Sequence, residues 1–154
     1  MSATTRLMPM EVSNTRIFEA SRETLFEAFA EPEKLKHWCG PEGFTNTIHA
    51  FDFKPEGVWH FTMHAPNGPD FENTSTFSEI VAPARIVFVH HLPVHIFTMT
   101  MTFAAEGSGA RLTWLMQFEP SVDNASLKDF ITAANEQNFD RLSAFLDLAS
   151  RSAK

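Results

Sequence analysis

Residues 96–103 read IFTMTMTF, and this octet decides the fold class. Its large apolar side chains at Phe97, Met99, Met101 and Phe103 alternate with positions that are threonine in three cases out of four. A period of two is typical of a β-strand that packs one face against a core and exposes the other face to water. The octet therefore predicts a half-buried strand in a sheet with one apolar face.

Similar strand patterns lie on both sides of this octet. The expected strands are residues 12–20, 44–53, 58–65, 71–81, 85–92, 95–105 and 110–119. Turns rich in Pro, Gly and Asn, such as residues 54–57 and 66–69, separate several of them. Because short turns join antiparallel neighbours, we expect about seven strands in one antiparallel sheet.

Helical patterns occur after the first strand and at the C-terminus. Ser21 is a candidate N-cap for a short helix, and Pro32 opens a second short helix that ends at Gly40-Pro41. Residues 124–151 then keep a helical period throughout. The order of one strand, two short helices, six strands and one long helix predicts an α+β fold. A curved sheet closed by one helix forms a cup with an apolar interior.

Composition narrows the classes of function. The chain has 154 residues and a formal net charge of −7, with no cluster of Lys or Arg, so binding to nucleic acid is disfavoured. No stretch approaches the ~18 apolar residues of a membrane span, so we expect no membrane insertion. One cysteine, Cys39, excludes an internal disulfide and fits a reducing compartment.

These properties predict one domain over residues 1–154 in the cytoplasm, with no signal peptide. Residues 1–9 precede the first expected strand and are the segment where disorder is considered. The outer strand faces are acidic and rich in threonine, which leaves both a monomer and a homodimer open.

Four segments resemble, in order, the signatures of one known family. They are residues 18–21 (FEAS), 38–41 (WCGP), 57–64 (GVWHFTMH) and 79–88 (EIVAPARIVF). They are similar to the heat-shock-protein-90 ATPase activator C-terminal-like group of the START-like, or SRPBCC, superfamily. The resemblance implies the helix-grip fold, in which about seven antiparallel strands wrap around the C-terminal helix. It implies no reaction, because members range from lipid and hormone carriers to polyketide cyclases and chaperone regulators.

The interior of the cup supplies the candidate ligand-binding residues. They are Trp38, Phe61, Met63, His90, Met99, Met101, Trp114, Asn135, Asn138 and Phe139. Methionine and aromatic side chains adapt to irregular apolar molecules. Asn135 and Asn138 fall within the apolar stripe of the long helix, where an unpaired amide costs about 1–3 kcal/mol. They orient a polar group of a ligand or hold water, or they bond to sheet side chains or backbone, or the helix is rotated so that they lie at its edge. On the first interpretation, Asn138→Leu weakens ligand binding and keeps the fold.

The favoured function is therefore binding of a small hydrophobic or amphipathic molecule inside the cup. One alternative is a cyclase or hydrolase that uses His90 or His60 as acid–base, with a carboxylate in reach inside the cavity. Another is a chaperone-regulating or other protein-interaction module, which requires a large exposed apolar patch. None of the seven histidines has the spacing of a zinc signature, so we expect no metal and no cofactor.

Two smaller expectations concern Cys39 and the turn near Pro83. No cation flanks Cys39 in the sequence, so we expect an inert thiol. Glu79 and Arg85 bracket the turn, and we expect an ion pair there in place of a catalytic role.

Overall fold

The computed structural model describes residues 10–92, 96–119 and 125–152. Strand β1 (Glu11–Phe18) leads to the short helices α1 (Arg22–Ala30) and α2 (Pro32–Trp38), and the chain ends in the long helix α3 (Ala125–Ser152). Between them lie β2 (Thr45–Phe51), β3 (Val58–His64), β4 (Asp70–Val81), β5 (Arg85–Leu92), β6 (Phe97–Glu106) and β7 (Gly109–Phe118). The predicted order of elements is confirmed.

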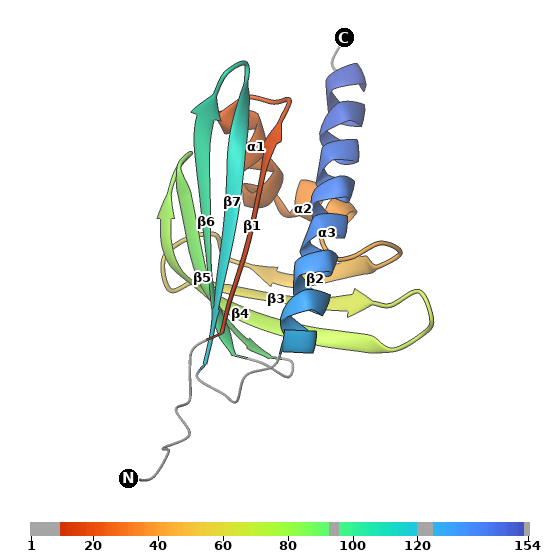
Figure 1. The fold of residues 1–154 in the computed structure, drawn as a ribbon. Coiled ribbons are helices and arrows are strands. Elements are labelled where there is room, and N and C mark those ends of the chain that lie inside the picture. The colour runs from red at the N-terminus through yellow and green to blue at the C-terminus, as the bar shows by residue number, and fades with distance from the viewer. Residues whose placement is uncertain (1–9, 93–95, 120–124, 153–154) are drawn as a thin grey trace.

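All seven strands form one antiparallel sheet in the order β1-β7-β6-β5-β4-β3-β2. Strands β2 to β6 each pair with the next strand in sequence, and β1 lies at the far edge beside β7. The sheet twists so strongly that β2–β4 run nearly across β1, β6 and β7, and α3 crosses its concave side (Figure 1). This is the helix-grip arrangement.

The octet that decided the fold class lies in β6, between β5 and β7. Met99, Met101 and Phe103 are buried, and the threonines between them point to the other face. The strand begins at Phe97, so Ile96 lies just outside it and is 45% exposed. The predicted half-buried strand is therefore confirmed, with its first residue corrected.

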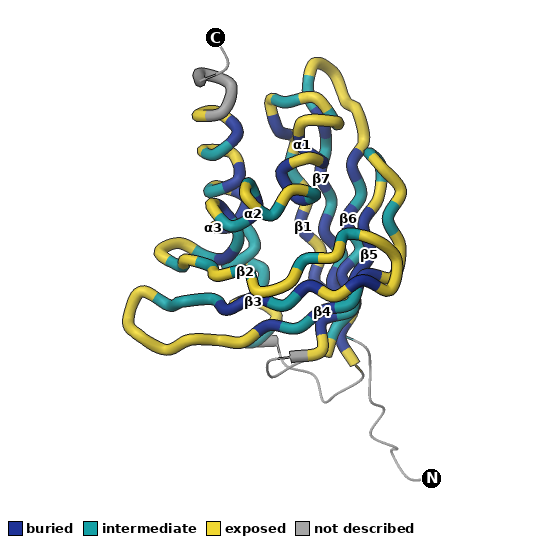
Figure 2. Tube along the Cα trace, turned by 180° about the vertical axis from the view of Figure 1, so that it is seen from behind, coloured by how far each residue is buried: buried dark blue, intermediate teal, exposed yellow. Residues whose placement is uncertain are grey.

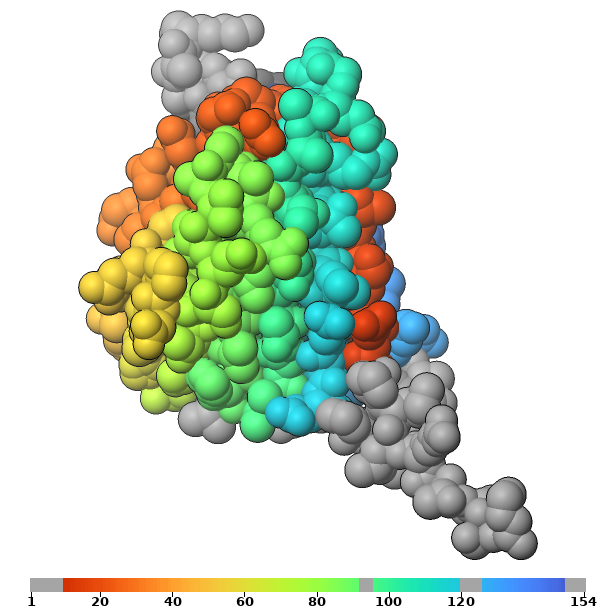
Figure 3. Space-filling view, turned by 90° about the vertical axis from the view of Figure 1, so that its left-hand side faces the viewer, coloured from red at the N-terminus to blue at the C-terminus, as the bar shows by residue number. Residues whose placement is uncertain are grey.

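The core lies between the concave face of the sheet and the helices. Buried segments of the strands face buried segments of α1 and α3 (Figure 2). Seen from the left-hand side of Figure 1, the outer face of the sheet is continuous, and α3 is visible only at one edge (Figure 3). Phe139 of α3 is 0% exposed and packs edge to face on Phe18 and Trp114, with ring centroids 5.7 and 4.7 Å apart.

Two local interactions predicted from the sequence are present in the structure. Ser21 Oγ accepts a hydrogen bond from Thr24 N at 3.1 Å, which confirms Ser21 as the N-cap of α1. Glu79 and Arg85 form the expected ion pair across the β4–β5 turn. Among the described residues, no helix is long and apolar enough to cross a membrane.

Residues 1–9, where disorder is considered, and His95, the first residue of an expected strand, lie outside the described residues.

Candidate functional site: a cavity between the sheet and the long helix

A cavity of about 240 Å³ lies between the concave face of the sheet and helices α2 and α3. For scale, a protein cavity of about 150 Å³ holds benzene. The wall comes mainly from β3, β4, β5, β6 and β7, and α3 contributes Ala134, Asn135 and Asn138. The space therefore accommodates a molecule somewhat larger than one benzene ring.

Nine of the ten residues selected from the sequence lie in the wall. They are Trp38, Phe61, Met63, His90, Met99, Met101, Trp114, Asn135 and Asn138. The tenth, Phe139, is a correction: it is not in the wall, and its ring packs against Phe18 of β1 and Trp114 of β7. Trp59 and Phe88 also line the cavity. That the lining residues bind a ligand remains a prediction.

Asn138 joins α3 to the segment that follows α2. Its Nδ2 donates to Trp38 O at 2.8 Å, and its Oδ1 accepts from Gly40 N at 3.1 Å. Both hydrogen bonds are buried, so each polar atom of this amide has a partner inside the protein. Of the interpretations drawn from the sequence, the structure favours bonding to backbone at this position, and that backbone belongs to α2 and the following loop, not to the sheet.

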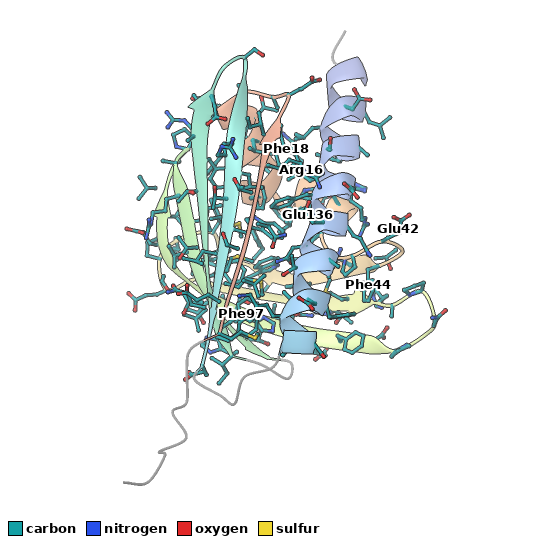
Figure 4. All side chains as sticks on the ribbon, in the orientation of Figure 1. Arg16, Phe18, Glu42, Phe44, Phe97 and Glu136 are labelled. Carbon is teal, nitrogen blue, oxygen red and sulfur yellow. The ribbon has the colours of Figure 1, made fainter. Side chains whose placement is uncertain are left out.

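Asn135 joins α3 to β1 instead. Its Nδ2 donates to Asn14 Oδ1 at 3.0 Å and lies 3.3 Å from Met116 Sδ. Asn14 in turn donates to Glu136 Oε2 at 2.8 Å, and Arg16 pairs with Glu136 at 2.8 Å. Figure 4 shows Arg16 and Glu136 meeting between β1 and α3. One polar network thus holds the helix against the first strand beside the cavity.

This network lowers the pKa of Glu136 through the hydrogen bond from Asn14 and then through Arg16, and burial opposes it only in part. A carboxylate with a lowered pKa stabilises the fold above its unfolded pKa of about 4.5, and this contribution is lost as pH falls through the lower folded value. We expect Glu136→Gln to lower the free energy of unfolding at pH 7 and to lower it by a smaller amount at pH 3.5. Urea unfolding at both pH values measures this, and an equal destabilisation at both would contradict it.

Arg141 binds the C-terminal end of α2, which is the segment that Asn138 also contacts. Its guanidinium donates to the carbonyl oxygens of His37, Cys39, Gly40 and Pro41 over 2.9–3.2 Å. A cation at the last carbonyls of a helix is favourable because those oxygens lack helical partners. Together with Asn138, Arg141 fixes the loop that forms one end of the cavity.

Cys39 lies in this loop and lines the cavity. Burial raises the pKa of Cys39 to about 12, although the nearby Arg141 charge opposes the shift. Because the thiolate is the reactive species, we expect iodoacetamide to alkylate native Cys39 about 1,000-fold more slowly at pH 7.5 than a thiol of unperturbed pKa. Mass spectrometry of native and urea-unfolded protein measures this, and equal rates in the two states would be the contrary result.

His90 lies in the wall as the alternation in β5 predicted. Its Nδ1 is 3.4 Å from Ser75 Oγ, and its ring stacks on Phe97 with centroids 4.7 Å apart. Among the described residues that line the cavity, none is Asp or Glu. The described part of the wall therefore includes no carboxylate of the kind that the acid–base alternative requires.

His60 is a second correction, because it points away from the cavity. Its side chain is 36% exposed on the outer face, and Nε2 lies 3.7 Å from Glu72 Oε2. His49 Nε2 lies 2.7 Å from Thr62 Oγ1, whose hydroxyl donates to Glu72 Oε1 at 3.0 Å. Ligand atoms of His49, His60 and Glu72 all lie within 4.8 Å, a grouping of metal-binding residue types that sequence spacing does not reveal. Pairing of β2, β3 and β4 creates it.

Exposed apolar side chains are spread over the described surface. The large ones are Ile17, Val58, Phe71, Val81, Ile96, Phe130 and Leu148. Phe71 and Val81 lie about 33 Å apart along β4, and Phe130 and Leu148 about 27 Å apart along α3. This scatter gives no support to one large apolar patch for a protein partner.

The family model described as Activator of Hsp90 ATPase homolog 1-like protein matches residues 19–147. A solved protein from Chromobacterium violaceum is 23% identical with a TM-score of 0.78, over 87% of this chain and 94% of that chain. One from Silicibacter pomeroyi that bears the family's name is 21% identical with a TM-score of 0.74, over 91% and 99%. One from Nitrosomonas europaea is 18% identical with a TM-score of 0.80, over 91% and 96%. These likenesses establish the fold alone. No curated protein matches the chain.

Proposed function

This chain belongs to the family of Activator of Hsp90 ATPase homolog 1-like proteins, and on that premise we propose that it binds a small hydrophobic or amphipathic molecule. The binding site is the cavity between the sheet and α3. The cytoplasmic location, the single domain and the possible homodimer remain predictions from composition.

The observation that carries the proposal is the chemistry of the wall. Aromatic rings and methionine side chains supply most of it, and no Asp, Glu, Lys or Arg is among the described lining residues. Ligand sites are typically concave and mostly apolar, with a few polar groups that orient the ligand. His90 and Ser75 contribute polar atoms to this wall.

The cyclase or hydrolase alternative receives less support. His90 lies in the wall beside Ser75 and Phe97, and His60 lies on the opposite face of the sheet. The acid–base route requires a carboxylate in reach of the imidazole, and the described lining residues include no Asp or Glu. For the protein-interaction alternative, the described residues form no large exposed apolar patch.

Two measurements on the gently purified protein test the proposal. Native mass spectrometry before and after organic extraction detects any small molecule that co-purifies with the protein. Indane, a bicyclic hydrocarbon of suitable size, should raise the unfolding temperature, because a molecule that binds only the folded state stabilises it. The polar compound myo-inositol serves as the control and should cause no shift. If no mass co-purifies and 1 mM indane causes no shift, the proposal is wrong.

A further inference from the structure

All three tryptophans of the chain line the cavity, and two of them have an indole nitrogen without a partner. Trp59 and Trp114 are 6% and 5% exposed, and Nε1 of each is buried with no acceptor among the described residues. Buried donors are nearly always paired in folded proteins, so each exception requires an explanation.

Trp38 differs from these two tryptophans, because its indole N–H has a hydrogen-bond acceptor within the protein. Its Nε1 donates to Ala28 O at 3.1 Å, inside the protein. Trp38 also lines the cavity, so position in the wall does not by itself leave an indole N–H unpaired.

The aromatic neighbours of the two unpaired indoles are phenylalanine rings. Trp59 lies nearly parallel to Phe61 and Phe77, with interplanar angles of 19° and 2°. Trp114 meets Phe139 edge to face at 4.7 Å. Phenylalanine offers no oxygen or nitrogen acceptor, and therefore these neighbours cannot pair the indole N–H in the ordinary way.

The other polar groups of the wall are engaged within the protein, and the wall carries no fixed charge. Both atoms of the Asn138 amide bond to backbone, and Asn73 Nδ2 donates to Phe71 O at 3.0 Å. No Lys or Arg is among the described lining residues to pair with an anionic ligand. A charge that enters such a site without a partner is strongly disfavoured.

We infer that the ligand is uncharged and carries a hydrogen-bond acceptor, such as the carbonyl oxygen of a ketone or lactone, which accepts from Trp59 or Trp114. The inference rests on the proposed function and specifies the chemical class of the molecule bound. It separates neutral carbonyl compounds from plain hydrocarbons and from carboxylates of the same size.

Three probes of matched size test the inference: indane, 1-indanone and indane-1-carboxylate, each titrated into the protein by calorimetry at pH 7. We expect 1-indanone to bind about tenfold more tightly than indane, because its carbonyl pairs a donor that the hydrocarbon leaves unpaired. The carboxylate should bind at least tenfold more weakly than indane.

Trp59→Phe and Trp114→Phe then identify the donor. Each variant removes one indole N–H, and indane binding within the same variant corrects for altered packing and shows that the cavity still forms. The ketone-to-hydrocarbon ratio should fall about tenfold in at least one of them. Trp38→Phe is the matched control and should leave the ratio unchanged, since its N–H already bonds to Ala28.

The outcomes separate this inference from the proposed function. If indane binds but 1-indanone binds no more tightly, or if both tryptophan variants keep the parental ratio, the acceptor inference is wrong and the binding function stands. Tight binding of the carboxylate would overturn the neutral class. If none of the three probes binds, the proposed function is wrong and the inference falls with it.

Discussion

Asn138→Leu is expected to destabilise the protein by about 2–5 kcal/mol, because it leaves Gly40 N and Trp38 O buried and unpaired. For a chain of this size, that loss lowers the unfolding temperature by about 5–15 °C. It is also a large fraction of the total stability of a typical domain. Thermal and urea unfolding of purified protein measure the change.

Gln137→Leu provides the matched control on the preceding residue of α3. Gln137 is exposed, and its Oε1 accepts from Glu42 N at 3.3 Å in a solvent-exposed contact with the same loop. A surface substitution of this kind changes stability by about 0.5 kcal/mol or less. Equal stability of the two leucine variants would show that the two Asn138 hydrogen bonds contribute nothing.

The sequence alone supports a different expectation for Asn138→Leu, namely weaker ligand binding with the fold kept. The difference has a physical reason. The helical period correctly placed Asn138 on the inner side of α3, where its low exposure confirms it. Its partners are 98 and 100 residues away in the chain, so only the folded structure identifies them. Asn138→Leu therefore removes a structural bridge, and weakened ligand binding in that variant would not identify a ligand contact.

Period-two alternation predicted more of the site than helical periodicity did. It placed His90 on the inner face with Ile86 and Phe88, and all three are buried. It also placed His60 on the other face of the sheet from Trp59 and Phe61. This is the outer face, and His60 lies there in the structure. The proposed catalytic use of His60 conflicted with that pattern, and the alternation was the better guide.

Two features of the structure cannot be predicted from any pattern in the sequence. The pattern treats tryptophan only as an apolar residue that can line the cavity. Whether its indole N–H has a hydrogen-bond acceptor depends on the exact position of the ring in the folded protein. Trp38 and Trp114 are both candidate lining residues in the sequence, yet among the described residues Trp38 Nε1 has a carbonyl acceptor and Trp114 Nε1 has none. The His49, His60 and Glu72 grouping likewise depends on the register of three strands and on the irregularity between Ile48 and Ala50.

Ala134→Phe is expected to weaken indane binding about 100-fold or more while the protein stays folded. Ala134 lines the cavity from α3, so a phenyl ring at this position occupies space that the ligand requires. The larger side chain extends into an existing void of about 240 Å³, which limits the cost of overpacking. Calorimetric titration measures the loss of affinity, and the unfolding temperature reports on the fold.

Ala133→Phe is the control because the adjacent alanine is exposed and is not part of the cavity wall. Both substitutions replace alanine by the same weaker helix former in the same turn of α3, so their intrinsic cost to the helix is equal. Only the ring at residue 134 can fill the cavity, and Ala133→Phe should bind indane within about twofold of the parent. Parental affinity in folded Ala134→Phe would place the binding site elsewhere on the molecule. A loss confined to that variant would place it between the sheet and α3.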